Sequence, residues 1–206
     1  GVSVQEALHA GRLDTLDVPA VQAAVVRWND AQVPPPVREK RPDILRAEHV
    51  SFSYTKNRPV LRDLSFSIEE GEMVSIVGTN GAGKSTLAKV ICGLVGDTDG
   101  ALYLSGESMR GTTIKERSQS IGYVMQNPNQ MLCKPLIFDE VALGLRLNGV
   151  PEAEIPDRVE HALTICGLMP FRKWPVSALS FGQKKRVTIA SVLALEPKIM
   201  ILDEPT

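Results

Sequence analysis

The chain has 206 residues, of which 43% are hydrophobic and 23% are charged, and its formal net charge is −1. This is the composition of a globular protein that can bury a core, and it offers no bulk charge for binding nucleic acid or an acidic membrane surface. No apolar stretch approaches the roughly 18 to 20 residues that a membrane span needs. The cysteines, Cys92, Cys133 and Cys166, are odd in number and far apart, so we expect buried, reduced thiols of a cytosolic protein instead of a disulfide framework or a zinc site.

Residues 1–33 are predicted to form a separate helical segment, because Asp17 can cap a helix that has Pro19 in its first turn. The apolar residues that follow at helical spacing are Val21, Ala24, Val25 and Trp28. Residues 34–43 are rich in proline and charge and therefore predict a linker. The chain starts without methionine and stops directly after an apolar run that ends on acidic residues, so we expect a fragment of a longer protein.

Residues 44–70 change to the two-residue alternation of strands and predict an antiparallel sheet. The alternating residues are Leu45, Ala47, Val50, Phe52 and Tyr54, followed by Leu64, Phe66 and Ile68. Tyr54 precedes a glycine-rich loop and has a ring that can stack on a purine. The alternative, an ordinary strand aromatic, stays open.

The glycine-rich loop at residues 78–86 fits the pattern G-x-x-x-x-G-K-[ST] and follows an apolar run at 73–77 that predicts a strand. Its glycines free the backbone to converge its N–H groups on phosphate oxygens, and a helix beginning near Lys84 adds its N-terminus. We expect Lys84 to hold the outer phosphates and the Ser85 hydroxyl to ligate Mg²⁺. The predicted phosphate-binding residues are Gly78, Asn80, Gly81, Ala82, Gly83, Lys84, Ser85 and Thr86. The alternative is a glycine-rich turn that matches the pattern by chance.

Further strands are predicted at 101–104 and 121–125, and the second of them ends on Gln126. Because ligands bind at the carboxyl ends of parallel strands, Gln126 can sense a metal ion or water there, although a plain turn fits as well. Helical patterns with several prolines dominate from 131 to 178 and predict an inserted helical block. Such a block binds a partner, regulates the protein or packs as a lid.

A second helix N-terminus is predicted after residues 179–186, with Ser180 as N-cap and the helix itself over 187–195. Its unpaired N–H groups can bind a phosphate. The basic run at 184–186 is as consistent with a solvated face as with contact to a ligand.

The last apolar run, at 199–202, predicts a buried parallel strand that delivers Asp203 and Glu204 at its carboxyl end. Two carboxylates there are costly to bury without a cation, which favours Mg²⁺ beside Asp203. Glu204 suits a general base for an attacking water.

In this order and spacing, the elements resemble the ATP-binding cassette (ABC) ATPases over residues 44–206. The Leu-Ser-x-Gly-Gln element at 179–183 is the specific part, since many P-loop proteins share the others. The resemblance implies an α/β P-loop fold with an antiparallel β subdomain and an inserted helical subdomain, and it implies ATP and Mg²⁺ as ligands. The roles it implies are adenine stacking for Tyr54, the Walker A loop for 78–86, the Q-loop for Gln126, the signature for 179–183 and the Walker B pair for Asp203 and Glu204.

By the same resemblance, Glu204 and Gln126 are catalytic, and Ser85, Gln126 and Asp203 hold the metal ion. The family works as head-to-tail dimers, so the signature residues Ser180, Gly182 and Gln183 are expected to contact ATP in trans, on the P-loop of a second ABC ATPase domain.

A finer resemblance joins three stretches, at 126–130, 138–144 and 179–186, to the energy-coupling factor branch of importers of vitamins and transition-metal ions. It implies a transmembrane scaffold subunit, a solute-binding membrane subunit and a location on the inner face of the cell membrane, with no nucleic acid. Some members fuse two cassettes in one chain, in which case 1–33 is the tail of a preceding cassette.

Two departures from the family pattern bear on turnover. Phe181 replaces the first glycine of the commoner signature, and none of His9, His49 and His161 lies where the switch histidine belongs. We therefore expect this chain alone to bind nucleotide better than it hydrolyses it. The rival interpretations are a soluble ABC ATPase that acts on ribosomes or DNA, and a nucleotide-binding scaffold that no longer hydrolyses.

Overall fold

The computed structural model describes residues 40–56, 58–96 and 98–204. Nearly all of them belong to one compact unit, Arg41–Thr206. The helix predicted within 1–33 and the larger part of the predicted linker at 34–43 lie outside the described residues.

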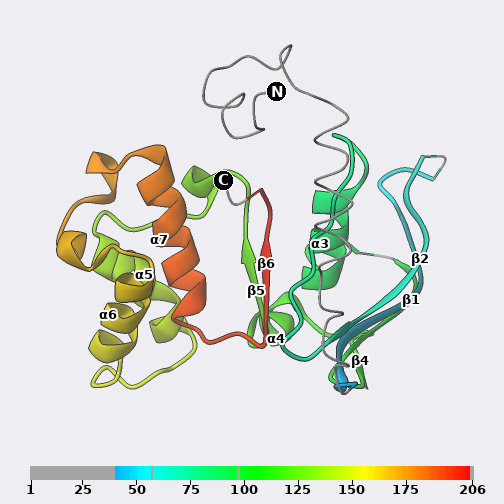
Figure 1. Cartoon of the computed structure of the whole chain (residues 1–206), viewed down its shortest axis with the longest axis horizontal. Helices are drawn as coiled ribbons and strands as arrows, with labels where there is room; N and C mark the ends of the chain where they lie inside the picture. Colours follow the sequence, from blue (N-terminus) through cyan, green and yellow to red (C-terminus); the bar gives the residue numbers. More distant parts are fainter. Residues whose placement is uncertain (1–39, 57, 97, 205–206) are drawn as a thin grey trace, which may run out of the picture. The chain divides into compact units, whose positions relative to one another are not determined.

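A four-stranded antiparallel sheet has the order β2-β1-β3-β4, and its strands are β1 (Asp43–Ser53), β2 (Pro59–Glu69), β3 (Asp99–Leu104) and β4 (Glu107–Ser108) (Figure 1). This confirms the predicted antiparallel sheet. The buried residues of β1 change from odd to even positions, from Leu45 and Ala47 to Val50 and Phe52. A register shift between Ala47 and Val50, with His49 at a φ of 51°, explains the change, because a bulge inserts one residue and restores the inward face.

The glycine-rich loop leads into α3 (Lys84–Cys92), which the sequence predicted. The prediction of a strand at 73–77 is wrong, because residues 72–79 have no regular secondary structure. A strand needs a neighbour for its backbone hydrogen bonds, and the described residues provide none for this run. Its apolar side chains are accordingly exposed, from 47% for Val74 to 98% for Met73.

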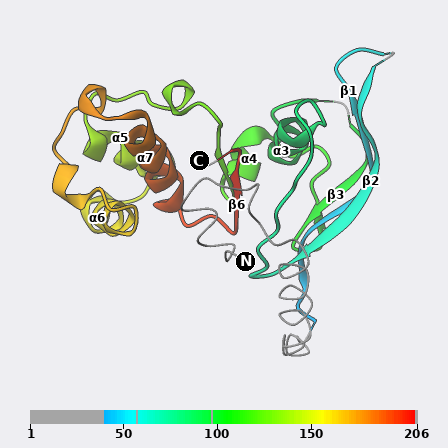
Figure 2. The same ribbon diagram turned by 45° about the horizontal axis from the view of Figure 1, so that its top comes forward.

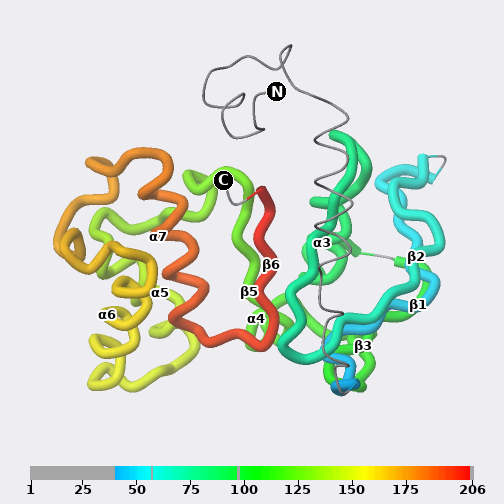
Figure 3. The backbone as a smooth tube through the Cα atoms, in the orientation of Figure 1, coloured from blue at the N-terminus to red at the C-terminus, as the bar shows by residue number. Residues whose placement is uncertain are grey.

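After β4 and the short α4 (Ile114–Ser118), β5 (Ile121–Val124) and β6 (Ile199–Leu202) form a parallel pair (Figure 3). Gly122 lets Val192 and Pro197 approach β5 closely, since a Cβ there would lie 2.3 Å from Cγ1 of Val192 and 3.0 Å from Cγ of Pro197. β6 is half-buried, which is less than predicted, and Leu202 is exposed. Because both strands end at the same edge, Gln126 and the Asp203–Glu204 pair leave the sheet together.

A helical block follows β5, as predicted. Its three longer helices pack against one another (Figure 2): α5 (Ile137–Leu147), α6 (Ile155–Ile165) and α7 (Phe181–Leu193). The 3₁₀ turn η2 (Pro128–Gln130) precedes α5, and the turns η3 (Met169–Phe171) and η4 (Val176–Ala178) lie between α6 and α7. The residues with no exposed surface at the centre of the block are Ile137, Val141, Ala142, Leu145, Val159, Leu163, Leu168, Val187 and Ala190. α7 contacts α5 and α6 and also β5, so it joins the block to the parallel strands.

None of the described helices could cross a membrane. An α-helix rises 1.5 Å per residue, so a hydrocarbon core of about 30 Å needs about 20 residues. The longest described helix, α7, has 13 residues.

Candidate nucleotide-binding site

The N-terminus of α3 is open to a ligand. The first carbonyl bond of the helix runs from the N–H of Leu87 to the oxygen of Gly83, at 2.8 Å. The three preceding N–H groups, of Lys84, Ser85 and Thr86, therefore have no carbonyl partner within the helix. The cap residue Gly83 offers no side chain to them. These N–H groups and the helix dipole together make an anion site.

Two of the three predicted glycines are required by the loop's conformation. Gly81 and Gly83 have φ angles of 82° and 97°, in the region that disfavours other residues. A Cβ on Gly83 would also lie 3.0 Å from Cδ2 of Leu61 and 3.2 Å from the carbonyl oxygen of Val60, so the loop touches β2 here. Gly78 has an ordinary φ, and a Cβ on it would make only a normal contact with Ala82.

Lys84 places its ammonium inside the loop. Its Nζ donates hydrogen bonds to the carbonyl oxygens of Gly78, at 2.8 Å, and Thr79, at 3.0 Å. These two hydrogen bonds connect the end of the loop, at Lys84, to its start. The positive charge is thereby held beside the open N–H groups of α3, where a phosphate would need it.

Ser85 and Asp203 meet although 118 residues separate them in the chain. The Ser85 hydroxyl donates to Oδ1 of Asp203 at 3.1 Å, and the Tyr123 hydroxyl donates to Oδ2 at 3.0 Å. Burial, and then the bond to Asp203, raises the pKa of Tyr123, so this hydroxyl keeps its proton and stays a donor. A serine hydroxyl and a carboxylate are hard oxygen ligands that suit Mg²⁺, and the donor set therefore fits the predicted ion.

Gln126 and Glu204 lie side by side at the ends of β5 and β6. The Gln126 Nε2 donates a hydrogen bond to Oε2 of Glu204. Glu204 has a φ of 46°, in the left-handed region. A residue with a side chain in such a region costs about 1–3 kcal/mol and is often found at functional sites. The structure thus brings together the two residues for which the sequence predicted a catalytic role.

Tyr54 lies beside α3 with much of its ring exposed. Its hydroxyl is 3.4 Å from Oγ1 of Thr86, and 56% of the residue is exposed. The Phe52 ring packs edge-on against it, with centroids 4.8 Å apart. The position next to the phosphate-binding end is compatible with stacking on a base, which remains a prediction.

The second predicted helix end closes on itself. α7 begins at Phe181, earlier than the predicted 187, and Ser180 is its N-cap as expected. The Ser180 hydroxyl accepts from the Gln183 N–H at 3.3 Å, and the Gln183 side-chain oxygen accepts from the Ser180 N–H at 2.9 Å. Space around Gly182 is open. Within the described residues no hydrogen bond joins this end to the glycine-rich loop, so its predicted ATP contact in trans remains a prediction.

A family model described as "ABC transporter" matches residues 61–206, which hold every part of this site except Tyr54. The chain belongs to the ABC transporter family. A provisionally named ABC transporter ATP-binding protein of Clostridium perfringens (strain 13 / Type A) is 57% identical over 170 residues, covering 82% of this chain and 30% of the relative. A similarly named protein of Enterococcus faecalis (strain ATCC 700802 / V583) is 51% identical over 207 residues, covering 100% of this chain and 36% of the relative. The chain thus spans about a third of the length of these curated relatives.

Two solved structures share the fold of this ABC chain. cbiO1 from Clostridium perfringens, described as part of the ABC transporter complex cbiONQ, has a TM-score of 0.72 at 35% identity, covering 80% of this chain and 66% of that one. A bacterial Atm1-family ABC exporter with ATP bound has a TM-score of 0.69 at 27% identity, covering 91% of this chain and 34% of that one. They confirm the predicted ABC ATPase fold, with its antiparallel β subdomain and inserted helical subdomain.

Sequence reasoning missed Lys185 in this ABC domain. The basic run at 184–186 predicted either a solvated face or a ligand contact, but Lys185 is only 5% exposed. Its Nζ donates to the carbonyl oxygens of Met125 and Gln126, both at 2.8 Å. Helical spacing could have predicted this burial, since Lys185 shares a face of the helix with the buried Thr188 and Val192.

The expectation of three buried thiols is also only partly right. Cys92 is buried, Cys166 is half-buried and Cys133 is exposed. Cys133 lies on the loop between β5 and α5, where the chain turns outward after Gln126. Among the described residues no group of three or more His, Cys, Asp or Glu side chains is placed to hold a metal ion.

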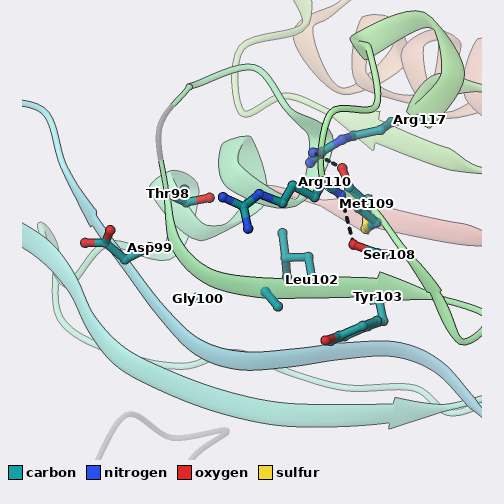
Figure 4. A pocket seen from close by; sticks show the side chains of 10 residues that line it. Thr98, Asp99, Gly100, Leu102, Tyr103, Ser108, Met109, Arg110 and Arg117 are labelled. Atoms are coloured by element: carbon teal, nitrogen blue, oxygen red, sulfur yellow. Dashed lines mark hydrogen bonds between the residues drawn. The ribbon is translucent and has the colours of Figure 1, made fainter.

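A pocket of about 340 Å³ lies on the antiparallel β subdomain, away from the predicted site residues (Figure 4). Leu102, Tyr103 and Arg110 line it, together with Arg117. The Arg117 guanidinium is occupied in capping α3, because it donates to the carbonyl oxygens of Val90, Ile91 and Met109. Nothing at this pocket points to a ligand.

Proposed function

We propose that this chain is the ATP-binding and ATP-hydrolysing domain of an ABC importer of the energy-coupling factor type, which takes up a vitamin or a metal ion through separate membrane subunits. The observation that carries the ATPase part is the 3.1 Å hydrogen bond between Ser85 and Asp203. It joins the phosphate-binding loop to the acidic end of β6, and P-loop NTPases hold Mg²⁺ with a serine or threonine and an aspartate from these two places.

The chain's own residues divide the work of hydrolysis. Lys84 and the open N–H groups of α3 bind and orient the phosphates. Ser85 and Asp203, with Gln126, are the residues that would hold Mg²⁺, which supplies positive charge against the phosphate oxygens. Glu204 takes a proton from the attacking water, and Gln126 holds the Glu204 carboxylate in place through their hydrogen bond.

A second ABC domain would complete the site, in a head-to-tail dimer. Ser180, Gly182 and Gln183 would contact the ATP that this second domain holds, and its signature would contact the ATP at Lys84. Two features support the arrangement: space is open at Gly182, and within the described residues no hydrogen bond joins the two helix ends. Phe181 is exposed beside them and would line the same contact.

Exposed apolar side chains on the helical block favour a membrane partner. Leu136 and Trp174 are 40% and 48% exposed and lie on two segments that meet at a bridge between Leu136 and Pro175. Cys133 is exposed on the same loop, after Gln126. A transmembrane scaffold subunit that binds here would connect nucleotide-dependent movement to transport, with a solute-binding membrane subunit attached to it. The chain would then work at the inner face of the cell membrane.

The test is copurification with the complete gene product. The tagged full-length protein is extracted from membranes in mild detergent, and its partners are identified by mass spectrometry. We expect a small integral membrane scaffold and a second membrane subunit, whose identity would indicate the solute. Ribosomal proteins or nucleic acid, without any membrane protein, would contradict the importer and leave an ABC ATPase that acts elsewhere.

A further inference from the structure

Lys185 is a buried cation whose partners are all main-chain carbonyl groups. It lies in the first turns of α7 and is 5% exposed. Its Nζ donates to the oxygens of Met125 and Gln126, at 2.8 Å each, and to that of Asp203, at 3.3 Å. An ammonium group has three hydrogens to donate, so these three acceptors satisfy it completely.

The three carbonyl groups belong to the ends of β5 and β6. The last paired residues of the two strands are Val124 and Leu202, and the last bond between them runs from the Asp203 N–H to the Val124 oxygen, at 2.9 Å. Beyond that point the strands exchange no further main-chain bond within the described residues. Lys185 connects the strands beyond this point, because its ammonium donates hydrogen bonds to carbonyl groups at both strand ends.

The backbone that Lys185 holds carries the catalytic side chains. Gln126 and Asp203 are its direct partners, and Glu204 follows Asp203 with the left-handed φ of 46°. The hydrogen bond between Gln126 and Glu204 depends on the spacing of the two strand ends. A shift of one end relative to the other would break this bond and move the carboxylate.

Burial of this charge is costly, which argues that it does more than fill space. A lysine ammonium is rarely buried without a carboxylate partner, and an apolar side chain of the same volume would fill the space but would leave the three carbonyl groups without this donor. Burial lowers the pKa of Lys185, while the nearby charges of Asp203 and Glu204 raise it.

We infer that Lys185 is a positioning residue for ATP hydrolysis: it fixes the main chain of Gln126 and Asp203 and ties both to the helix that carries the signature. The inference rests on the proposed function, since it assigns Lys185 to the same reaction. The capping box at Ser180 and the Lys185 ammonium are on one continuous helix, α7. A contact of the partner's ATP with Ser180 would therefore be felt at this domain's own Gln126 and Asp203.

The chain supplies its own control, because Lys184 precedes Lys185 on the same turn. Lys184 is half-buried, and its Nζ donates to the Asn129 side chain at 3.2 Å, not to a strand end. Lys184→Met and Lys185→Met remove the same charge from the same helix. Lys185→Arg keeps the charge and the donors.

The first experiment measures ATP turnover by the full-length protein in its complex. In Lys185→Met we expect kcat to fall about 10- to 100-fold, since small misplacements of catalytic groups cost that much, with the KM for ATP little changed because Lys84 is intact. Lys185→Arg should recover part of the loss, and Lys184→Met should keep wild-type kcat. Wild-type kcat in Lys185→Met would overturn the inference.

A double-mutant cycle separates positioning from a general loss of structure. If Lys185 acts through Gln126, Lys185→Met should lower kcat much less in a Gln126→Ala background than in the wild type. An equal loss in both backgrounds would contradict the inference. It would mean that the effects of the two substitutions are additive, as expected if Lys185→Met damages the fold independently of Gln126.

Hydrogen exchange of the full-length protein gives a readout that needs no turnover. Lys185→Met should speed the exchange of amide hydrogens at 125–130 and around Asp203, and Lys184→Met should not. Unchanged exchange at both strand ends would overturn the inference whatever the ATPase does. A wild-type protein without ATPase activity would instead contradict the proposed function, while faster exchange in Lys185→Met would still support the connection between α7 and the strand ends.

Discussion

The N-termini of α3 and α7 differ in how their free N–H groups are satisfied. α3 begins after Gly83, whose left-handed backbone leaves the helix without a side-chain cap. α7 begins after Ser180, which forms a reciprocal capping box with Gln183. A glycine N-cap is weaker than a serine N-cap by only about a few tenths of a kcal/mol, so α3 loses little stability by leaving its N–H groups open. The difference indicates that all the first N–H groups of α3 are open to a ligand, whereas at α7 the capping box has already paired the N–H of Gln183 and leaves those of Phe181 and Gly182 open.

The two helix ends also differ in their neighbours. Around the start of α3 lie a lysine, two carboxylates and a glutamine, all from the same chain. Around the start of α7 lie Phe181, exposed, and Gly182, with open space. Changes at the first end should therefore alter what this domain does alone, and changes at the second should alter what it does with a partner.

The largest effect should come from Glu204→Gln, beside the α3 end. Glutamine keeps the size of the side chain but cannot accept the proton of water, so turnover by the full-length protein should fall about 10² to 10⁴-fold. Nucleotide binding, measured by equilibrium titration, should remain. Undiminished turnover would remove Glu204 from the role of general base.

Lys84→Ala should weaken nucleotide binding itself, because it removes the charge inside the loop. A hydrogen bond to a charged group is worth about 1.5–3 kcal/mol, which corresponds to roughly 10- to 100-fold in affinity. The control is Lys89→Ala, in the last turn of α3. The comparison of the two helix ends would fail if both variants bound nucleotide like the wild type.

Ser180→Ala tests the other end and should have a smaller effect on the isolated domain. It removes the cap of α7 and should lower the free energy of unfolding by about 1 kcal/mol, as measured in a denaturant titration. Affinity for nucleotide at α3 should not change, whereas turnover in the full-length protein should decline. A loss of nucleotide affinity in the isolated domain would show that the two ends are not independent.

A further prediction concerns the C-terminal end of α3, where burial raises the pKa of Cys92 from 9.0 to about 11. Because the folded pKa lies above the unfolded one, the neutral thiol stabilises the fold below pH 9, and this contribution is lost as the pH rises towards about 11. The free energy of unfolding of the wild-type protein should fall over that interval, and that of the Cys92→Ala variant should fall less.

At pH 8 an alkylating reagent should modify the exposed Cys133 first and Cys92 last.

The sequence predicted those parts of the molecule that local rules determine. The loop at 78–86, the cap at Ser180 and the strands β5 and β6 follow from glycine positions, capping residues and short apolar runs. The run at 73–77 looked the same as β5, but a strand also requires a paired neighbour, which local pattern does not report. Lys185 was missed for a related reason, since its acceptors come from Met125 and Gln126, about 60 positions earlier in the chain.

Around the start of α3, the structure brings Ser85 to Asp203 and Gln126 to Glu204, but these direct contacts were not predictable. The bonds of Asp203 to Ser85 and Tyr123 depend on how α3 and two strands pack. The burial change along β1 depends on the register shift around His49, which moves the buried positions from Leu45 and Ala47 to Val50 and Phe52. Such effects arise from pairing across the sheet and lie beyond any window of neighbouring residues.

The left-handed backbone of Glu204 has a consequence for how this position can vary. Glycine would adopt a φ of 46° without strain, and asparagine would do so more easily than glutamate. A library of variants sorted only for folding should therefore enrich glycine or asparagine here, whereas one sorted for ATP turnover should retain glutamate. If the two selections favour different residues in this way, position 204 would be one where activity and thermal stability oppose each other.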